Sequence, residues 1–581
     1  MKLNKVLPLA IFATLACAPA LFASKQKSID VHKIGTTTMA EAATRATTLA
    51  FSTSSQLRPK SMLKQLPRPG QQHGLFTVQA NRSLANGIVF GGYPVVGPDP
   101  SFSGFDGIDS TDSGNAVGFV AEPPDQGLST NGKQVAEAVN LAFQVFSTTG
   151  KPLIQPFSLY ALYNVSTAPN SDGTLNQLSD PRVFFDWESG HWFMTIISYK
   201  TTAAGALTGG SQVLVAVSES SDALSNYTID SVDVSDASYG ACPCLGDQPL
   251  LGLNQDGVYL NTNEYSTSTG QFQTALVTAI NKRDLIEGAS TVIAAGFDGL
   301  TLAEGQAFSV QPAFPAPGTV TSQNRGTEFF TSTLDFNGTG DNRVAVWAMT
   351  DTETLKDNVP NLNFQQTIVH TEEYSSPGPA VQKTGPYPLG MSLAQPEELL
   401  DSGDDRMEQL FYAGGKLYCA FNTTLLAPKG TSGPRTGGAW FAIQPKATFA
   451  SLSASVPHQG YIGIPNESVL YPSFAVDQSG NGAIAFTITG PNYFPSTGYV
   501  HFQGGNIQPK VHLAGIGQDP EDGFSGYPQF GGAGVARWGD YGAAMISPDG
   551  SVWLASEYIP NTTARPRTQY TNWGTFISHL R

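Results

Sequence analysis

Short apolar runs of β-strand length recur along this 581-residue chain, and turn-forming residues separate them. Four stretches align without a gap: "DPRVFFDWESGHW" from Asp180, "DQPLLGLNQDGVY" from Asp247, "DRMEQLFYAGGKLY" from Asp405 and "DYGAAMISPDGSVW" from Asp540. In each stretch a Gly follows ten residues after the Asp, and an aromatic residue comes two or three residues after that Gly. The pattern predicts a hairpin whose Gly has a positive φ and whose aromatic packs between sheets.

Weaker copies of this hairpin begin near residues 125, 310 and 470, which brings the number of units to seven. Consecutive starts are 55, 67, 63, 95, 65 and 70 residues apart. The longest spacing predicts an insertion near residues 360–403, which include a Pro-rich stretch. Repeated units of short antiparallel strands are typical of β-propellers. We therefore predict an all-β, seven-bladed β-propeller over residues 86–581, with six blades as the alternative.

The last unit of the repeat is one strand short. It offers "AAMIS", "VWLASEY" and "NWGTFISHL", whereas a propeller blade has four strands. A strand from the N-terminal part, near "NGIVFGGYPVV" or "AVGFVAE", is predicted to join it, so that pairing of N- and C-terminal strands closes the ring. Helix signals are few, and the clearest is "NKRDLIEG" after Ile280.

The first 23 residues have the layout of a secretory signal peptide: a short basic head, an apolar run, and small residues before Ser24. We expect an exported protein, secreted/extracellular or periplasmic. A lipid anchor at Cys17 is less favoured, because "TLA" before it is a poor lipoprotein box. Residues 24–85 are predicted to form a flexible leader or linker. No later apolar run approaches the roughly 18 to 20 residues that a membrane-spanning helix requires.

Charge differs between the leader and the rest of the chain. Residues 1–75 contain ten Lys and Arg against two Asp and Glu, whereas the remaining 506 residues contain 21 against 45. Charged residues make up only 13% of the chain, beside 61 Gly and 39 Pro, which is typical of an all-β secreted protein. The acidic body argues against nucleic acid and anionic membranes as partners. It suits a neutral glycan or a cation equally well.

Three cysteines follow the signal segment: Cys242 and Cys244 in "ACPCLG", and Cys419 in "LYCAF". In an oxidising compartment, these three cysteines can form one disulfide and leave one free thiol. We interpret Cys419 as a small, buried hydrophobic residue. A metal site built on "CPC" is not favoured, because no further ligands stand at a recognisable spacing.

The repeat units resemble the sialidase-type, or bacterial-neuraminidase-repeat, β-propellers. The segments "PPDQG…VAEAVNLAFQVF", "DDRMEQLFYAGGKLYCAFNT" and "RWGDYGAAMISPDGSVWLASEY" are similar to secreted bacterial propeller proteins, mostly of unassigned function. The similarity covers roughly residues 115–581 and implies the fold rather than an activity. The sialidase Asp-box, Ser-x-Asp-x-Gly-x-Thr-Trp, is matched only loosely, since "SPDGSVW" has Asp549 directly before Gly550.

Carboxylates at the starts of the innermost strands are the main candidates for chemistry, because in a propeller these starts form a ring around the central channel. The candidate catalytic residues are Asp180, Asp247, Asp405, Glu408 and Asp540, with Asp125 as a further rim aspartate. Glycoside hydrolysis needs a carboxylic acid and a second carboxylate across a sugar. In the competing structural interpretation, each Asp accepts hydrogen bonds from backbone amides. A bound Ca²⁺ is a third explanation.

Arginine and aromatic residues near these acids are candidates for substrate binding. Arg182, Arg406 and Arg537 would bind an anionic substrate through bidentate contacts, as the sialidase arginine triad does. Their offsets from the Asp differ between units, which weakens the comparison with that triad. Trp538 and Tyr541 would stack on a sugar face, although aromatics in a propeller are usually core.

Two Glu–Tyr pairs also bear on the resemblance, because a Tyr with a neighbouring Glu is the sialidase nucleophile arrangement. They are Glu264 with Tyr265 in "NEY", and Glu557 with Tyr558 in "SEY". Both pairs occupy the same place in their repeats, at the end of a second strand. We therefore expect them to lie away from the rim and to be structural.

Two functions stay open after these considerations. One is a sialidase-like glycoside hydrolase that acts on an extracellular glycan at the rim, and the alternative is a non-catalytic propeller that binds a glycan, a surface protein or the cell surface. The chain contains no HExxH, GxSxG or P-loop motif. No cofactor is firmly predicted, Ca²⁺ remains a candidate, and a monomer is expected.

Overall fold

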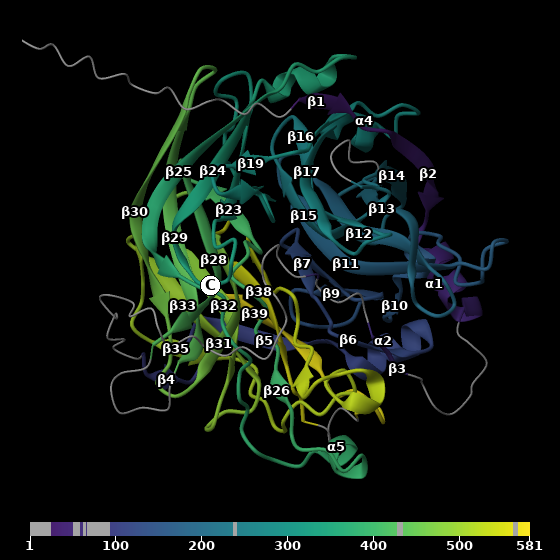
Figure 1. Cartoon of the computed structure of the whole chain (residues 1–581), viewed down its shortest axis with the longest axis vertical. Coiled ribbons are helices and arrows are strands. Elements are labelled where there is room, and N and C mark those ends of the chain that lie inside the picture. Colours follow the sequence, from purple (N-terminus) through teal and green to yellow (C-terminus); the bar gives the residue numbers. More distant parts are fainter. Residues whose placement is uncertain are drawn as a thin grey trace, which may run out of the picture.

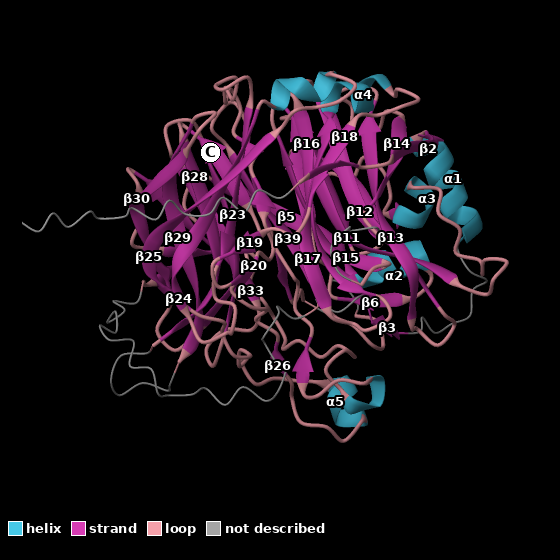
Figure 2. Ribbon diagram, turned by 45° about the horizontal axis from the view of Figure 1, so that its top comes forward, coloured by secondary structure: helices cyan, strands magenta, loops and turns pink. Residues whose placement is uncertain are grey.

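Seven sheets of four or more strands make up most of the described molecule. The structure is a computed structural model that describes residues 25–49, 59–61, 66, 93–235, 241–426, 434–561 and 567–581. Figures 1 and 2 show the sheets side by side, with the earlier blades in blue and teal in Figure 1 and the later ones in green and yellow. The protein is an all-β, seven-bladed β-propeller, as the repeat predicts. The predicted signal peptide lies outside the described residues.

Blades 1 to 4 follow one another along the chain. Blade 1 contains β7 (Gly127–Thr130), β8 (Gln134–Val139), β9 (Ala142–Ser147) and β10 (Phe157–Ser158). Blade 2 contains β11 (Leu175–Asp186), β12 (His191–Thr201), β13 (Leu207–Ser218) and β14 (Tyr227–Asp233). Blade 3 contains β15 (Cys244–Leu253), β16 (Gly257–Ser266), β17 (Phe272–Asn281) and β18 (Ala294–Phe297). Blade 4 contains β21 (Gln311–Pro312), β23 (Thr327–Thr333), β24 (Asp341–Thr350) and β25 (Asn363–Tyr374).

Blades 5 to 7 complete the series. Blade 5 contains β27 (Leu410–Ala413), β28 (Lys416–Leu425), β29 (Arg435–Ala447) and β30 (Leu452–Ile462), with β22 (Phe314–Pro315) parallel to β27. Blade 6 contains β31 (Ser468–Val476), β32 (Gly482–Thr489), β33 (Ser496–Gln503), β34 (Asn506–Ile507) and β35 (Val511–Leu513). Blade 7 contains β37 (Ala543–Ile546), β38 (Val552–Tyr558) and β39 (Gly574–Leu580). The first strand of blade 7, β37, packs against β7 of blade 1 and β31 of blade 6.

The N-terminal part of the chain adds outer strands to two early blades. β1 (Gln26–Ser28) pairs with β18, and β2 (Val31–Thr37) pairs with β14. Figure 1 shows both in purple along the outside of blades 2 and 3, and α1 (Met39–Leu49) follows β2. The predicted flexible leader is therefore wrong for residues 26–49, because Ile29 and Val31 are buried in the largest core cluster.

Blade 7 receives its fourth strand from β5 (Phe102–Asp109), which pairs antiparallel with β39. This strand lies between the two segments that the sequence suggested. In the first of them, β4 (Val95–Val96) joins β35 of blade 6, and in the second, β6 (Val120–Glu122) pairs with β3 (Pro59–Ser61). The strand was missed because "FSGFDGID" contains two Gly and two Asp, which are depleted in strands.

The long connection between blades 4 and 5 starts later than predicted. Residues 363–374 form β25, so the connection runs from 375 to 409 rather than from 360. It carries α5 (Pro388–Ser392) and β26 (Leu399–Leu400), which Figure 1 places at the bottom of the molecule. β26 pairs in parallel with β36 (Val535–Ala536), just before blade 7. A small hairpin of β19 (Thr301–Leu302) and β20 (Gly305–Gln306) follows blade 3.

The clearest helix signal is confirmed by α4 (Lys282–Glu287). The side chain of Asn281 accepts a hydrogen bond from the N–H of Arg283 (3.0 Å) at its start, and Gly288 ends it with a φ of 59°. The remaining helices are α2 (Ser110–Val117), α3 (Leu159–Leu162), η1 (Thr352–Lys356) and η2 (Pro528–Phe530). Among the described helices, none has the length and apolar character that crossing a bilayer demands.

The predicted hairpin geometry holds in three of the four aligned stretches. Gly190, Gly415 and Gly550 have φ values of 74°, 76° and 82°. Gly257 instead begins β16 without a positive φ. The aromatic positions are buried in all four stretches: Trp192, Tyr259, Tyr418 and Trp553. The cysteines also follow the expectation, since Cys242 and Cys244 form a disulfide and Cys419 is a buried free thiol.

Candidate functional site

The inner strands carry an irregularity at the level where the sequence places the rim. The pairing register shifts after Ser179 in β11, after Asp247 in β15 and after Leu470 in β31. The residues with positive φ at this level are Asp125, Asp180, Gln248, Ser309 and Tyr471. Asp180 and Gln248 are therefore structural equivalents, and Asp247 stands one residue earlier. This one-residue offset corrects the simple alignment of the aspartates, because after the bulge five residues of β11 pair with β12 before the turn, whereas four residues of β15 pair with β16.

At this level, asparagine side chains of one blade accept hydrogen bonds from backbone N–H groups of the next blade. Asn140 accepts a hydrogen bond from the N–H of Asp180 (3.0 Å), and Asn422 accepts one from the N–H of Tyr471 (2.7 Å). Asn263 accepts from the N–H of Ser309 at 2.9 Å. A bulge frees a backbone N–H from the sheet, and a buried N–H needs a partner. These contacts join consecutive blades, which is a structural role.

The junction between blades 7 and 1 is built from charged residues instead. The N–H of Asp540 donates to the carboxylate of Asp125, and the side chain of Asn140 donates to the same carboxylate at 2.6 Å. Asp540 also forms an ion pair with Arg537 at 2.8 Å. Both partners of that ion pair are about nine-tenths buried. We call this group the blade 7–1 junction.

A second charged group links blade 5 to blade 3. Arg406 forms two hydrogen bonds to Asp404 (2.8 and 2.7 Å) and one to the side-chain oxygen of Gln248 (2.8 Å). The amide nitrogen of Gln248 donates in turn to Glu408 at 2.7 Å. Asp405, between these partners in sequence, is fully buried in the loop before β27. We call Asp404, Arg406, Glu408 and Gln248 the blade 5–3 network.

One residue of the N-terminal segment lies against this network. The N–H of Leu66 donates to Oδ2 of Asp247 (3.1 Å), and its carbonyl accepts hydrogen bonds from Arg406 (3.0 Å) and Tyr265 (3.2 Å). Its side chain packs against Tyr199 and Leu245. Asp247 and Arg406 therefore present an acceptor and a donor to the backbone N–H and C=O of one residue.

Burial and like charge raise the pKa of several rim carboxyls. Burial, and then the charge of Asp540, raise the pKa of Asp180 to about 6. Burial, and then the charge of Asp180, raise the pKa of Asp247. Burial, with Asp540 and Asp180 next, raises the pKa of Asp125, and burial raises the pKa of Glu408 against the opposing charge of Arg406. The charges of Asp180 and Asp540 thus act on the carboxyls of Asp125 and Asp247, so these four residues, spread over the chain, lie in one region.

The candidate binding residues lie in the same region but are buried. The guanidinium of Arg182 lies over the ring of Tyr541, 3.3 Å from its centroid, and its Nε and Nη2 have no hydrogen-bond partner among the described residues. The hydroxyl of Tyr541 donates to the carbonyl of Pro181 at 2.9 Å. Trp538 is 1% exposed and belongs to a core cluster. A small cavity beside Trp538 and Glu557 has space for about one water molecule.

The two Glu–Tyr pairs are closer to the rim than the sequence suggested. Tyr265 contacts Leu66, which also contacts Asp247. Glu557 lines the cavity beside Trp538, and burial followed by the charge of Asp125 raises its pKa. The expectation that both pairs lie away from the rim is therefore wrong, because in an antiparallel hairpin the end of the second strand lies beside the start of the first, as in the pairing of Leu245 with Tyr265.

Three glutamates that sequence analysis did not single out lie close to one another. They are Glu122 in β6, Glu398 before β26 and Glu521. Burial raises the pKa of Glu122 to about 7, and burial with the charge of Glu122 raises the pKa of Glu398 to about 9. All three stand outside the repeated hairpin, so no internal alignment could have revealed them.

Comparisons with known proteins add a likeness of architecture. No known family profile and no curated protein sequence matches the chain. Matched solved structures include a Trypanosoma rangeli sialidase in complex with sialic acid, with 9% identity, 71% of this chain and 56% of that chain covered, and a TM-score of 0.31. They also include the phage phi92 endosialidase (8% identity, 83% and 69% covered, TM-score 0.30) and an exo-β-1,3-galactanase from Clostridium thermocellum (9% identity, 83% and 96% covered, TM-score 0.28). Sequence identities and TM-scores this low do not indicate an activity, so the activity of this chain has to be inferred from its own residues.

Proposed function

We propose that this protein is exported and acts on an extracellular glycan at the channel rim. The observation that carries the proposal is the pair of contacts that Asp247 and Arg406 make to the backbone N–H and C=O of Leu66. A carboxylate that accepts from an N–H also accepts from a sugar hydroxyl, and a guanidinium donates to sugar oxygens as it does to a carbonyl. Export is supported by the signal-peptide layout of residues 1–23.

The finer form of the proposal is sialidase-like glycoside hydrolysis. It is supported by the charge of Asp180, which after burial is the largest cause of the raised pKa of Asp247, because neighbouring carboxyls of this kind favour a state in which one is protonated and one is ionised. Such a pair supplies the acid and the second carboxylate that glycoside hydrolysis needs. The unpaired Nε and Nη2 of Arg182 are suited to an anionic group on the sugar.

The test is a screen of the purified full chain for sugar release from a panel of neutral and sialylated polysaccharides. Asp180→Asn and Asp247→Asn keep the size of the side chain and remove the acid. We expect each to lower the rate of release by at least about 100-fold. The control is Asp357→Asn, which changes an exposed aspartate on the loop before β25. Release that survives both rim variants would contradict the residue assignment.

The second candidate is a non-catalytic binding propeller. It is favoured by the pairing of the rim charges with one another and by the small size of the cavity beside Trp538. Binding of a polysaccharide in the same screen without any release would support this function. Absence of both binding and release over the panel would contradict glycan recognition altogether.

A further inference from the structure

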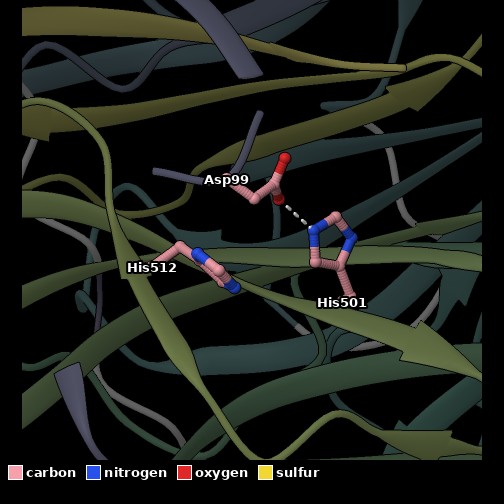
Figure 3. Close-up of side chains that lie close together, drawn as sticks. All are labelled: Asp99, His501 and His512. Carbon is pink, nitrogen blue, oxygen red and sulfur yellow. Dashed lines mark hydrogen bonds and ion pairs between the residues drawn. The ribbon is translucent and has the colours of Figure 1, made fainter. Parts of the chain in front are cut away.

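Three side chains with metal-ligating groups meet on the outer half of blade 6. Asp99 lies between β4 and β5, His501 is on β33, and His512 is on β35. One ligand atom from each residue lies within 4.8 Å of the ligand atoms of the other two. Within the described part of the chain, this is the one group of His, Cys, Asp or Glu side chains close enough together to hold a metal ion. Figure 3 shows the carboxylate and the two imidazole rings gathered around a common space.

The carboxylate of Asp99 is held in a fixed orientation. Its Oδ1 accepts a hydrogen bond from the N–H of Ser101 at 2.7 Å. Its Oδ2 lies 2.5 Å from Nε2 of His501 and 3.1 Å from the hydroxyl of Tyr499. One oxygen is therefore used for positioning, and the other is directed at the histidine.

The ring of His512 is held by a backbone carbonyl and an aromatic ring. Its Nδ1 lies 3.0 Å from the carbonyl oxygen of Gly97, which can only accept, so Nδ1 carries the proton and Nε2 keeps a lone pair. The ring stacks on Tyr499 with 5.0 Å between centroids and 11° between planes. A hydrogen bond from the second ring nitrogen to a carbonyl is the usual support of a metal-binding histidine.

We infer that Asp99, His501 and His512 form a binding site for a divalent transition metal of the zinc class. Two imidazoles and a carboxylate are ligands that Zn²⁺ accepts, with bonds of about 2.0–2.2 Å. Ligand atoms around a tetrahedral ion of this size stand about 3.3 Å apart. The observed separations, from 2.5 to at most 4.8 Å, bracket that value, so side-chain rotations are sufficient.

The site leaves one coordination position for solvent. The side chains of Asp99 and His501 are 18% and 25% exposed, so water reaches the metal position. The geometry of three protein ligands and one solvent molecule is a common zinc arrangement. An acidic chain also attracts cations from solution.

A metal at this place would tie three separate segments together. Asp99 belongs to the segment that runs from β4 on blade 6 to β5 on blade 7, whereas both histidines belong to blade 6 itself. The two histidines are on β33 and β35, which follow β31 and β32 in the strand order from the channel outwards. The site is therefore separate from the proposed glycan site, and its expected effect is on the stability of the seam between blades 6 and 7.

The test measures zinc binding by the full chain after treatment with a chelator. We expect calorimetry to show one Zn²⁺ bound per chain and the Tm to rise when zinc is added. His501→Gln and His512→Gln should each weaken zinc binding by about 100-fold or more and remove the rise in Tm. The control is His370→Gln, which changes an exposed histidine on β25 and should behave as the unchanged chain does.

Two results would overturn the inference: no zinc binding by the unchanged chain, or equal zinc affinity in the chain with His512→Gln. If either histidine variant fails to fold, Asp99→Asn gives the same comparison, because Asn keeps an acceptor for Ser101 and loses the charge that binds the metal. Tyr499→Phe keeps all three ligands and should retain zinc binding within about tenfold.

Discussion

Blades 5 and 7 begin with the same residue types and use them differently. In blade 7, Arg537 pairs with Asp540, whose N–H reaches Asp125 in the adjacent blade 1. In blade 5, Arg406 pairs with Asp404 and extends to Gln248 in blade 3, past blade 4. The first group joins neighbours, and the second joins blades that are not adjacent.

The intervening blade explains the difference. Blade 4 has Ser309 at the level where blade 3 has Gln248. The short side chain of Ser309 already accepts a hydrogen bond from Asn263 of blade 3. Arg406 therefore finds its partner one blade further on. An Asp and an Arg that recur in a repeat thus predict where a charged pair will stand. The length of the side chains in other blades then decides which residue the Arg contacts there.

The largest effect is expected from Arg406→Met, which breaks the blade 5–3 network. It leaves Asp404 buried without its cation and the oxygen of Gln248 without its donor. Removing one partner of a buried ion pair costs about 3–5 kcal/mol, and we expect the free energy of unfolding in urea to fall by that amount. Arg283→Met is the control, because this arginine is exposed in α4 and its ion pair with Glu287 is screened by solvent. A loss below about 1 kcal/mol for Arg406→Met would show that the network does not hold the blades.

The free energy of unfolding should depend on pH through the buried carboxyls near the blade 7–1 junction, in contrast to exposed carboxyls elsewhere in the chain. The pKa of Asp180 is raised to about 6, so the folded state holds this proton more firmly than the unfolded state does. Its contribution to stability is complete below about pH 4 and is lost as the pH rises to about 6. A shift of this size corresponds to at most about 3 kcal/mol.

Asp180→Asn should therefore flatten the fall in the free energy of unfolding between pH 4 and 6, as measured by urea denaturation at several pH values. The matched change Asp357→Asn, at an exposed loop position, should keep the original slope. An identical slope in Asp180→Asn and the unchanged chain would mean that Asp180 ionises in the folded state as a free carboxyl does.

The sequence was sufficient for the blades because their information is local. Apolar runs, a turn glycine and an aromatic recur within about 15 residues in four of the units, and such short-range signals predict hairpins directly. β5 escaped because its glycines and aspartates conceal a strand that forms only on the edge of blade 7.

The candidate site was predictable in its residue types and not in its contacts. Asp180, Arg406 and Asp540 were identified from the sequence, and Asp540 lies close enough to interact electrostatically with the other two. Gln248 and Leu66 could not be found in this way, because they meet Arg406 across 158 and 340 residues of sequence. Asp247 is also shifted by one residue relative to Asp180, because β15 has one pair fewer than β11 between the bulge and the turn, and no ungapped alignment shows such a shift.

The smallest effect, and the one that best separates the two charged groups, is expected from Leu66→Pro. Proline removes the N–H that donates to Asp247 and keeps the carbonyl that accepts from Arg406. We expect a loss of about 1 kcal/mol in the free energy of unfolding, which is the usual net contribution of one hydrogen bond. Leu66→Ala is the control, because it shortens the side chain and keeps both backbone contacts.

Double-mutant cycles then assign Leu66 to one group or the other. Leu66 contacts Arg406 directly, so the effects of Leu66→Pro and Arg406→Met should be non-additive by at least about 0.5 kcal/mol. Leu66→Pro combined with Arg537→Met should be additive within about 0.5 kcal/mol, because Arg537 pairs with Asp540 at the blade 7–1 junction. Coupling to Arg537 equal to the coupling to Arg406 would mean that the two groups form one network around the rim.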